Sequence, residues 1–153
     1  MTGKAEFTDQ EWETVLGGPP SAGMIVVFAA HGGTFRETIA IGKSYAHARE
    51  QHGASELLDA IVAAKPEIDH TRYSSVEEFR SHGLERLRDA VGVLERKATP
   101  QEVEDYRGFV VMLADKVAEA HREDGVAISA PEQAAIDEIT ASLGAGPAAQ
   151  PGG

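Results

Sequence analysis

Apolar residues recur at helical spacing along the second half of the chain. After Ser75 they are mostly three or four positions apart, at Val76, Phe79, Leu84, Leu87, Val91 and Leu94. Two similar series follow, one at Val103, Tyr106, Val110, Leu113, Val117 and Ala120, and one at Ala135, Ile136, Ile139 and Leu143. Such spacing places the apolar side chains on one face of a helix. The breaks between the three segments are short, so we expect three helices that pack antiparallel.

Several segments begin with the sequence that is typical of a helix N-terminus. In this pattern a Ser or Thr side chain accepts a hydrogen bond from a free backbone N–H, and a Glu three residues later reaches back. It occurs at Thr8/Glu11, Thr34/Glu37, Thr99/Glu102 and Ser129/Glu132, and Ser74 and Ser75 followed by Glu77 and Glu78 offer a fifth. Because these positions open apolar-periodic stretches, the pattern predicts a chain dominated by helices.

Clusters of glycine and proline divide the first half of the chain. We expect helices at about 9–16, 20–30, 35–51 and 55–64, separated by Gly17-Gly18-Pro19-Pro20, His31-Gly32-Gly33 and His52-Gly53. Three consecutive β-branched residues within 24–28 favour a strand instead. The other candidate strand, residues 126–128, is too short to make a sheet. Residues 20–30 are therefore interpreted as a buried central helix.

Together these elements predict an all-α fold, a single-domain bundle of about six or seven helices. We expect a flexible N-terminus at 1–6, the helical domain at 7–143, and a disordered tail rich in Gly, Pro and Ala at 144–153. The length of 153 residues, of which 42% are hydrophobic, suits one domain with a substantial core.

Net charge limits the partners that the chain can bind. There are 25 Asp and Glu residues against 14 Lys and Arg, which gives a net charge of -11. This charge repels phosphate backbones and anionic lipids, so we expect no nucleic acid partner and no membrane partner. The longest apolar run, residues 24–30, is shorter than the ~20 residues of a membrane span, and the first residues do not read as a secretory signal. A cytoplasmic location is expected.

Catalytic motifs in the sequence are incomplete. His31-Gly32-Gly33 after an apolar stretch is typical of an esterase oxyanion loop, but the nearest nucleophile motif, residues 42–46, lacks its second glycine and lies in a predicted helix. Gly42-Lys43-Ser44 also matches the end of a phosphate-binding loop, yet Glu37 stands where that loop needs a glycine. With no cysteine, thiol nucleophiles and thiolate metal sites are excluded. We expect no cofactor, and the interpretation leans toward a protein that is not an enzyme.

The leading hypothesis is a non-enzymatic helical module that binds a protein partner or a small ligand. For a small ligand we expect a pocket between the apolar central helix and its neighbours, near Trp12, Met24, Phe28, His31 and Tyr45. Trp12 is the sole tryptophan, and its ordinary role would be to anchor the opening helix in the core rather than to stack on a ligand.

Two alternatives belong to other functional classes. His47 with Glu50 and His82 with Glu85 place a histidine and a carboxylate three positions apart on two helices. If the two pairs converged on one ion, the protein would be a metal-binding or redox helical bundle. The third hypothesis is self-assembly into a homo-oligomer through an apolar stripe left over on the helix at 100–122.

Residues near both ends of the chain carry a family resemblance. They are the opening Phe7-Thr8-x-x-Glu11-Trp12-x-x-Val15-Leu16, the stretch from Pro20 to Phe28, the Gly-Gly turn, and the ending from Ala127-Ile128-Ser129-x-x-Glu132 to Leu143-Gly144. Over residues 7–144 the chain resembles an uncharacterised family of small helical bacterial proteins, which implies a helical fold rather than an activity. Residues 118–139, which contain Glu-Asp-Gly-x-x-Ile-Ser-x-x-Glu, are similar to TerB-like domains linked to tellurite and stress response, which implies a stress-related setting.

Overall fold

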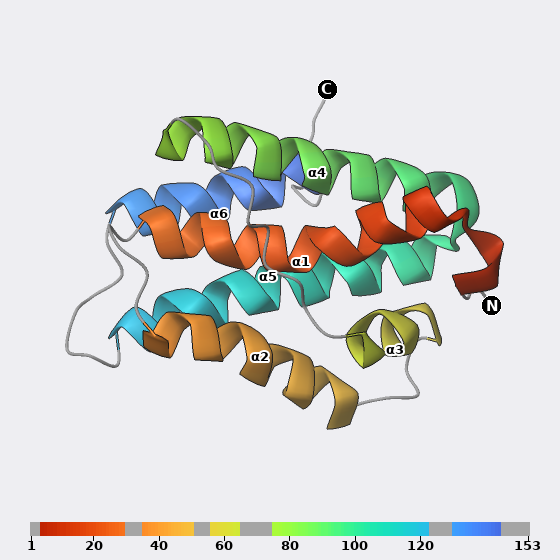
Figure 1. Cartoon of the computed structure of the whole chain (residues 1–153), viewed down its shortest axis with the longest axis horizontal. Helices are drawn as coiled ribbons and strands as arrows, with labels where there is room; N and C mark the ends of the chain where they lie inside the picture. The colour runs from red at the N-terminus through yellow and green to blue at the C-terminus, as the bar shows by residue number, and fades with distance from the viewer. Residues whose placement is uncertain (1–3, 30–34, 51–55, 65–74, 123–129, 145–153) are drawn as a thin grey trace.

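Six α-helices and one short 3-10 turn make up the part of the chain that the computed structural model describes, which is residues 4–29, 35–50, 56–64, 75–122 and 130–144. The turn spans Lys4–Glu6, and the helices are α1 (Asp9–Ala29), α2 (Phe35–Glu50), α3 (Glu56–Ala63), α4 (Val76–Lys97), α5 (Pro100–Arg122) and α6 (Ala130–Ser142). No strand occurs in these residues. The expected all-α bundle is confirmed (Figure 1).

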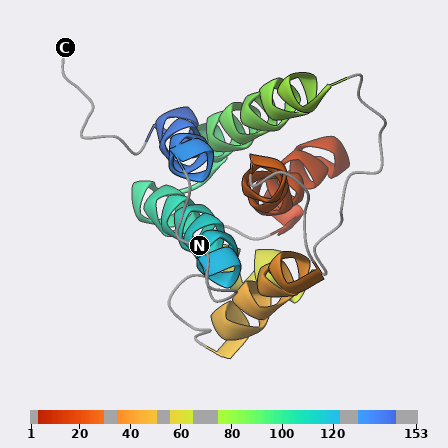
Figure 2. The same cartoon turned by 90° about the vertical axis from the view of Figure 1, so that its left-hand side faces the viewer.

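Helix α1 occupies the centre of the bundle. It contacts α4, α5, α6 and α2, and Figure 2 shows it with α4 on one side and α2 on the other. The β-branched residues Ile25, Val26 and Val27 lie in α1, and each is almost completely buried. Because neighbouring helices cover several sides of α1, a helix that is apolar all round is stable here. The interpretation of residues 24–28 as part of a buried central helix is confirmed.

The predicted break at residues 17–20 is wrong, because α1 runs unbroken from Asp9 to Ala29 with Pro19 and Pro20 inside it. A proline has no N–H, so it leaves one carbonyl of the preceding turn without its helical partner. For Pro19 that carbonyl belongs to Val15, and it accepts a hydrogen bond from the Tyr106 hydroxyl of α5 instead. The Tyr106 hydroxyl thus offsets part of the energetic cost of a proline inside a helix. That cost was the reason to expect a helix end at this point.

Hydrogen bonds confirm three of the predicted helix starts. The Glu11 N–H donates to Thr8 Oγ1 and the Thr8 N–H donates to Glu11 Oε1. The same reciprocal pair joins Thr99 and Glu102. At the start of α4 the Glu78 N–H donates to Ser75 Oγ. The predicted starts at Thr34 and Ser129 involve residues outside the described part of the chain.

The apolar stripes of the last three helices face the core as expected. Leu87, Val91 and Leu94 of α4 are buried, and so are the stripes of α5 and α6, with Val103, Tyr106, Val110, Leu113, Val117, Ala135, Ile136, Ile139 and Leu143. Helices α4, α5 and α6 contact one another and run antiparallel in chain order (Figure 1). Stripe burial therefore explains how these helices pack.

The chain ends can be compared with expectation only in part. Residues 4–6, assigned to a flexible N-terminus by the sequence, form a 3-10 turn, and the Glu6 carbonyl accepts a hydrogen bond from Lys97 Nζ at 3.1 Å. The predicted disordered tail lies outside the described residues except for Gly144, which has a positive φ of 71° just after α6. None of the described helices combines the length and apolarity needed to span a bilayer.

Candidate functional site

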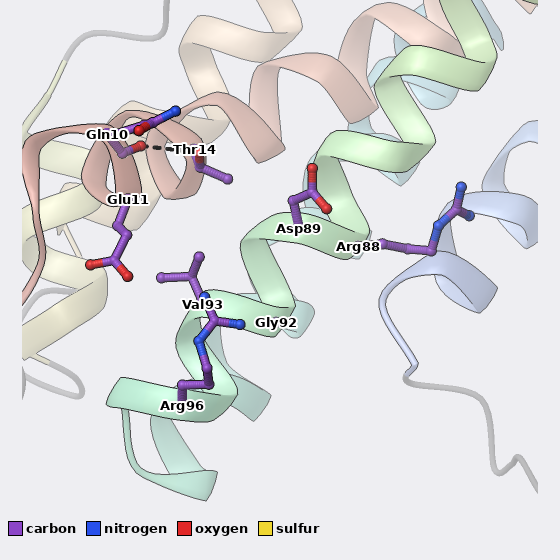
Figure 3. A pocket seen from close by; sticks show the side chains of 8 residues that line it. All are labelled: Gln10, Glu11, Thr14, Arg88, Asp89, Gly92, Val93 and Arg96. Atoms are coloured by element: carbon purple, nitrogen blue, oxygen red, sulfur yellow. Dashed lines mark hydrogen bonds between the residues drawn. The ribbon is translucent and has the colours of Figure 1, made fainter.

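A pocket with a volume of about 330 Å³ lies between the first turns of α1 and the second half of α4. Figure 3 shows its lining, in which three side chains come from α1 and the rest of the wall from α4. The lining residues are Gln10, Glu11, Thr14, Arg88, Asp89, Gly92, Val93 and Arg96. Polar and charged groups dominate it, so the pocket suits a ligand that forms hydrogen bonds and ion pairs.

The α1 wall is fixed by the local structure of the helix N-terminus. The reciprocal hydrogen bonds of Thr8 and Glu11 hold the first turn, and Trp12 and Val15 are buried in the core. Gln10, Glu11 and Thr14 are three or four positions apart, so they share a face of α1, and this face lines the pocket. The Thr14 hydroxyl donates to the Gln10 carbonyl at 3.0 Å, which leaves its oxygen lone pairs available to a ligand (Figure 3).

The α4 wall combines a small floor with long charged side chains. Val93 is 6% exposed and forms the apolar base of the pocket, while Gly92 beside it has no side chain to fill the space. Arg96 Nη1 lies 3.7 Å from the position that a Cβ on Gly92 would take. The Arg96 guanidinium therefore lies back over the preceding turn of α4, in the direction of Asp89 (Figure 3).

Glu11 is already compensated by neighbours on the protein. Its Oε1 accepts a hydrogen bond from Lys97 Nζ at 2.6 Å and another from the Thr8 N–H at 2.9 Å. The bond from Lys97, followed by that from the Thr8 backbone, lowers the pKa of Glu11. Lys97 also stands 5.9 Å from the centroid of the Phe7 ring. This carboxylate thus serves mainly to join α1 to the end of α4.

The remaining charges of the pocket differ in how they are paired. Arg88 extends toward α6, where Nη1 donates to Ser142 Oγ at 3.3 Å (Figure 3). Asp89 and Arg96 are exposed, and neither forms a hydrogen bond or ion pair with another described residue. They are seven positions apart on one helix, which corresponds to about 10 Å along its axis. Asp89 and Arg96 are therefore a carboxylate and a guanidinium of the same lining that have no partner among the described residues.

Residues predicted to bind a ligand lie elsewhere, and those that the structure describes do not line this pocket. Trp12 is 7% exposed and packs against Phe7, with 5.5 Å between ring centroids. Tyr45 is 2% exposed and packs edge-on against Phe109 at 5.2 Å, and burial raises the pKa of its hydroxyl. Both rings therefore have packing partners in the core.

Two further predicted ligand residues, Met24 and Phe28, lie in the second half of α1. Met24 is partly buried and packs against the core, and Phe28, also partly buried, meets the Phe79 ring edge-on at 4.9 Å between ring centroids. His31 lies outside the described residues. At least twelve positions along α1 separate Met24 and Phe28 from Trp12, and none of the described candidates lines the pocket between α1 and α4.

The two histidine–glutamate pairs predicted as an alternative metal site are not brought together. His47 and Glu50 are exposed on α2, and His82 and Glu85 are exposed on α4. The two helices lie on opposite sides of α1 in both views (Figures 1 and 2). Among the described residues, no group of three or more His, Asp or Glu side chains is placed to hold a metal ion.

The α4 residues that line the pocket were not predicted from the sequence, for a physical reason. Arg88, Gly92 and Arg96 follow one another at intervals of four, which places them along one face beside the buried stripe. A small residue between two arginines on a polar helix face is the only signal in the sequence. It becomes a pocket only because the start of α1 packs across this face.

The apolar stripe of α5 was expected to mediate self-assembly if it were left over. Its side chains from Val103 to Val117 are buried against the rest of the bundle, so the described part of α5 does not present that stripe to a second copy.

The chain was also compared with protein-family models, with curated proteins and with solved structures. None of the three comparisons finds a match.

Proposed function

We propose that this chain is a non-enzymatic helical binding module that holds a small polar ligand in the pocket between α1 and α4. The sequence left open whether the ligand is a small molecule or a protein partner. The observation that supports the small molecule is the pocket itself, about 330 Å³ of space lined by polar groups on two helices. Ligand pockets typically begin at about 300 Å³, so this volume suits a compact molecule.

The rigidity of the walls supports a binding role. Lys97, at the end of α4, donates to both Glu6 and Glu11, which holds the start of α1 against α4. Trp12 and Val93 anchor the two walls in the core. Sites built on packed helices keep their geometry without a ligand, which reduces the entropy lost on binding.

The character of the lining favours binding over catalysis. Its one hydroxyl, that of Thr14, donates to a backbone carbonyl rather than to a general base. Nucleophilic catalysis by a hydroxyl requires a base within hydrogen-bond reach. The cytoplasmic location, the stress-related setting and the relation to TerB-like domains stay predictions from the sequence.

A pocket-filling variant tests this function. Gly92→Leu would place a side chain in the pocket, whereas the matched control Gly108→Leu makes the same change on an exposed face of α5 where a Cβ meets nothing within 4 Å. We expect NMR amide shifts of α1 and α4 to respond to members of a library of small polar metabolites in wild type and G108L, and to lose the response in G92L. Shift changes confined to other helices, or unchanged in G92L, would contradict the proposal.

A further inference from the structure

We infer that the ligand of this pocket is a small zwitterion of the amino acid type, with its carboxylate on Arg96 and its ammonium on Asp89. This inference rests on the proposed function and names the chemical class of the ligand. It starts from the two side chains of opposite charge in the lining that have no partner among the described residues.

These two side chains are placed to bracket a ligand rather than to pair with each other. Their Cα atoms are about 10 Å apart along α4, because seven residues separate them at 1.5 Å per residue. The Arg96 guanidinium lies back toward Asp89 over Gly92, where the absence of a side chain leaves room. A molecule that carries both charges would fill the gap and satisfy both groups at once.

The other charges of the pocket do not change this balance. Glu11 is held by Lys97 and the Thr8 N–H, and Arg88 extends to Ser142 on α6. The lining thus carries two cations and two anions, of which Arg96 and Asp89 are the two that have no partner among the described residues. A simple anion would be attracted by Arg96 but repelled by Asp89 and by the net charge of -11, and a simple cation, which Asp89 and the net charge attract, would leave Arg96 without a partner.

The neutral part of the lining fits the body of such a molecule. Val93 supplies an apolar contact for a short carbon chain, and Gln10 and Thr14 supply hydrogen-bonding groups on the facing wall. The Gln10 side chain makes no hydrogen bond to another described residue, so its amide can both donate and accept. The pocket thus favours a compact zwitterion over a long or wholly apolar ligand.

The test compares zwitterions with their separate halves. L-alanine is titrated into isotope-labelled full-length protein next to propionate and ethylammonium, and γ-aminobutyrate next to butyrate and propylammonium, as the matched single charges. We expect at least one zwitterion to bind at α1 and α4 at least tenfold more tightly than either half, because only a zwitterion forms both charge-assisted contacts. Equal binding of zwitterion and half, or no binding of either zwitterion, would overturn the inference.

Variants test whether Asp89 and Arg96 bind the two charged groups of the zwitterion. Asp89→Asn and Arg96→Gln should each weaken the bound zwitterion about tenfold, while Glu77→Gln and Lys116→Gln, which remove the same charges at exposed positions outside the lining, should not. The double exchange of Asp89→Arg with Arg96→Asp should restore binding in the reverse orientation. If the metabolite library reports a ligand that G92L abolishes but D89N and R96Q leave unaffected, the pocket functions as proposed and the zwitterion inference is wrong.

Discussion

The Tyr106 hydroxyl of α5 donates a hydrogen bond of 2.7 Å to the Val15 carbonyl of α1, across 91 residues of sequence. The acceptor is the carbonyl that Pro19, four residues later, cannot bond. Both the tyrosine and the valine are fully buried, and burial raises the pKa of Tyr106, so the hydroxyl keeps its proton and remains a donor. One side chain therefore substitutes for the missing N–H of the proline.

Tyr106→Phe tests this relationship, since it removes the donor while retaining the ring. The Val15 carbonyl would remain buried without a partner, which costs about 1–3 kcal/mol. We expect the free energy of unfolding, measured by urea denaturation, to fall by that amount. A second variant tests the mechanism: Pro19→Ala restores an N–H at the right position, so Y106F should cost less in the P19A background. Equal losses in both backgrounds would contradict the substitution of hydroxyl for N–H.

Gly18→Ala should also destabilise the bundle, because a Cβ on Gly18 would overlap the Tyr106 hydroxyl and ring. Overpacking of this kind costs about 1–3 kcal/mol. At the adjacent position, Gly17→Ala meets nothing within 4 Å, and helix propensity predicts a gain of up to about 1 kcal/mol. Thermal or urea unfolding of the two variants measures the difference. The G18A loss should shrink in the Y106F background, and a loss that does not depend on Tyr106 would count against the contact.

Lys97→Met should remove a pH-dependent part of the stability. Lys97 lowers the pKa of Glu11 in the folded protein, so the ionised carboxylate stabilises the fold at pH values above its ordinary 4.5. This contribution is lost as the pH falls through the lower folded pKa. The difference in Tm between wild type and K97M is thus expected to be largest near neutral pH and to shrink as the pH falls below 4.5. A difference in Tm that is constant with pH would show that the hydrogen bond from Lys97 to the Glu6 carbonyl, rather than the ion pair with Glu11, accounts for the effect.

Asp115→Asn should raise the stability at neutral pH, whereas Lys97→Met should lower it. Partial desolvation of this exposed carboxyl, followed by the nearby charge of Glu119, raises the pKa of Asp115 above its ordinary 3.8. The folded state therefore binds a proton more readily than the unfolded state, and the ionised form lowers stability once the pH exceeds the folded pKa. We expect D115N to raise Tm at neutral pH and to leave it unchanged below about pH 3. Calorimetric scans from acid to neutral pH measure this, and a lower Tm for D115N at pH 7 would refute it.

Local signals in the sequence were sufficient for most of the fold. The reciprocal pairs at Thr8 and Thr99 form as predicted, since a capping box is satisfied within four residues. The stripe from Leu87 to Leu94 is buried because an apolar face needs only some partner, not a particular one. These features depend on short-range chemistry, which the sequence displays directly.

Features that depend on a distant partner could not be predicted in this way. The continuity of α1 through Pro19 relies on the Tyr106 hydroxyl, and no residue close to Pro19 in the sequence indicates that this hydroxyl will bond there. The pocket likewise requires that the face of Arg88 and Arg96 meets the start of α1. The chemistry of its side chain made Tyr45 a predicted ligand-binding residue. The packing of α2 on α5 instead buries its ring against Phe109.

Because α1 lies at the centre of the bundle, the core cannot close until the helices around α1 have been synthesised. This helix leaves the ribosome before the other five, yet three of the helices that cover it, α4, α5 and α6, start only at residue 76 and beyond. Its apolar surface therefore remains uncovered until α4, α5 and α6 have been synthesised. Contacts of such large sequence separation slow folding and lengthen the exposure of apolar surface to other chains. A nascent chain halted before α4 should consequently be a substrate for ribosome-associated chaperones.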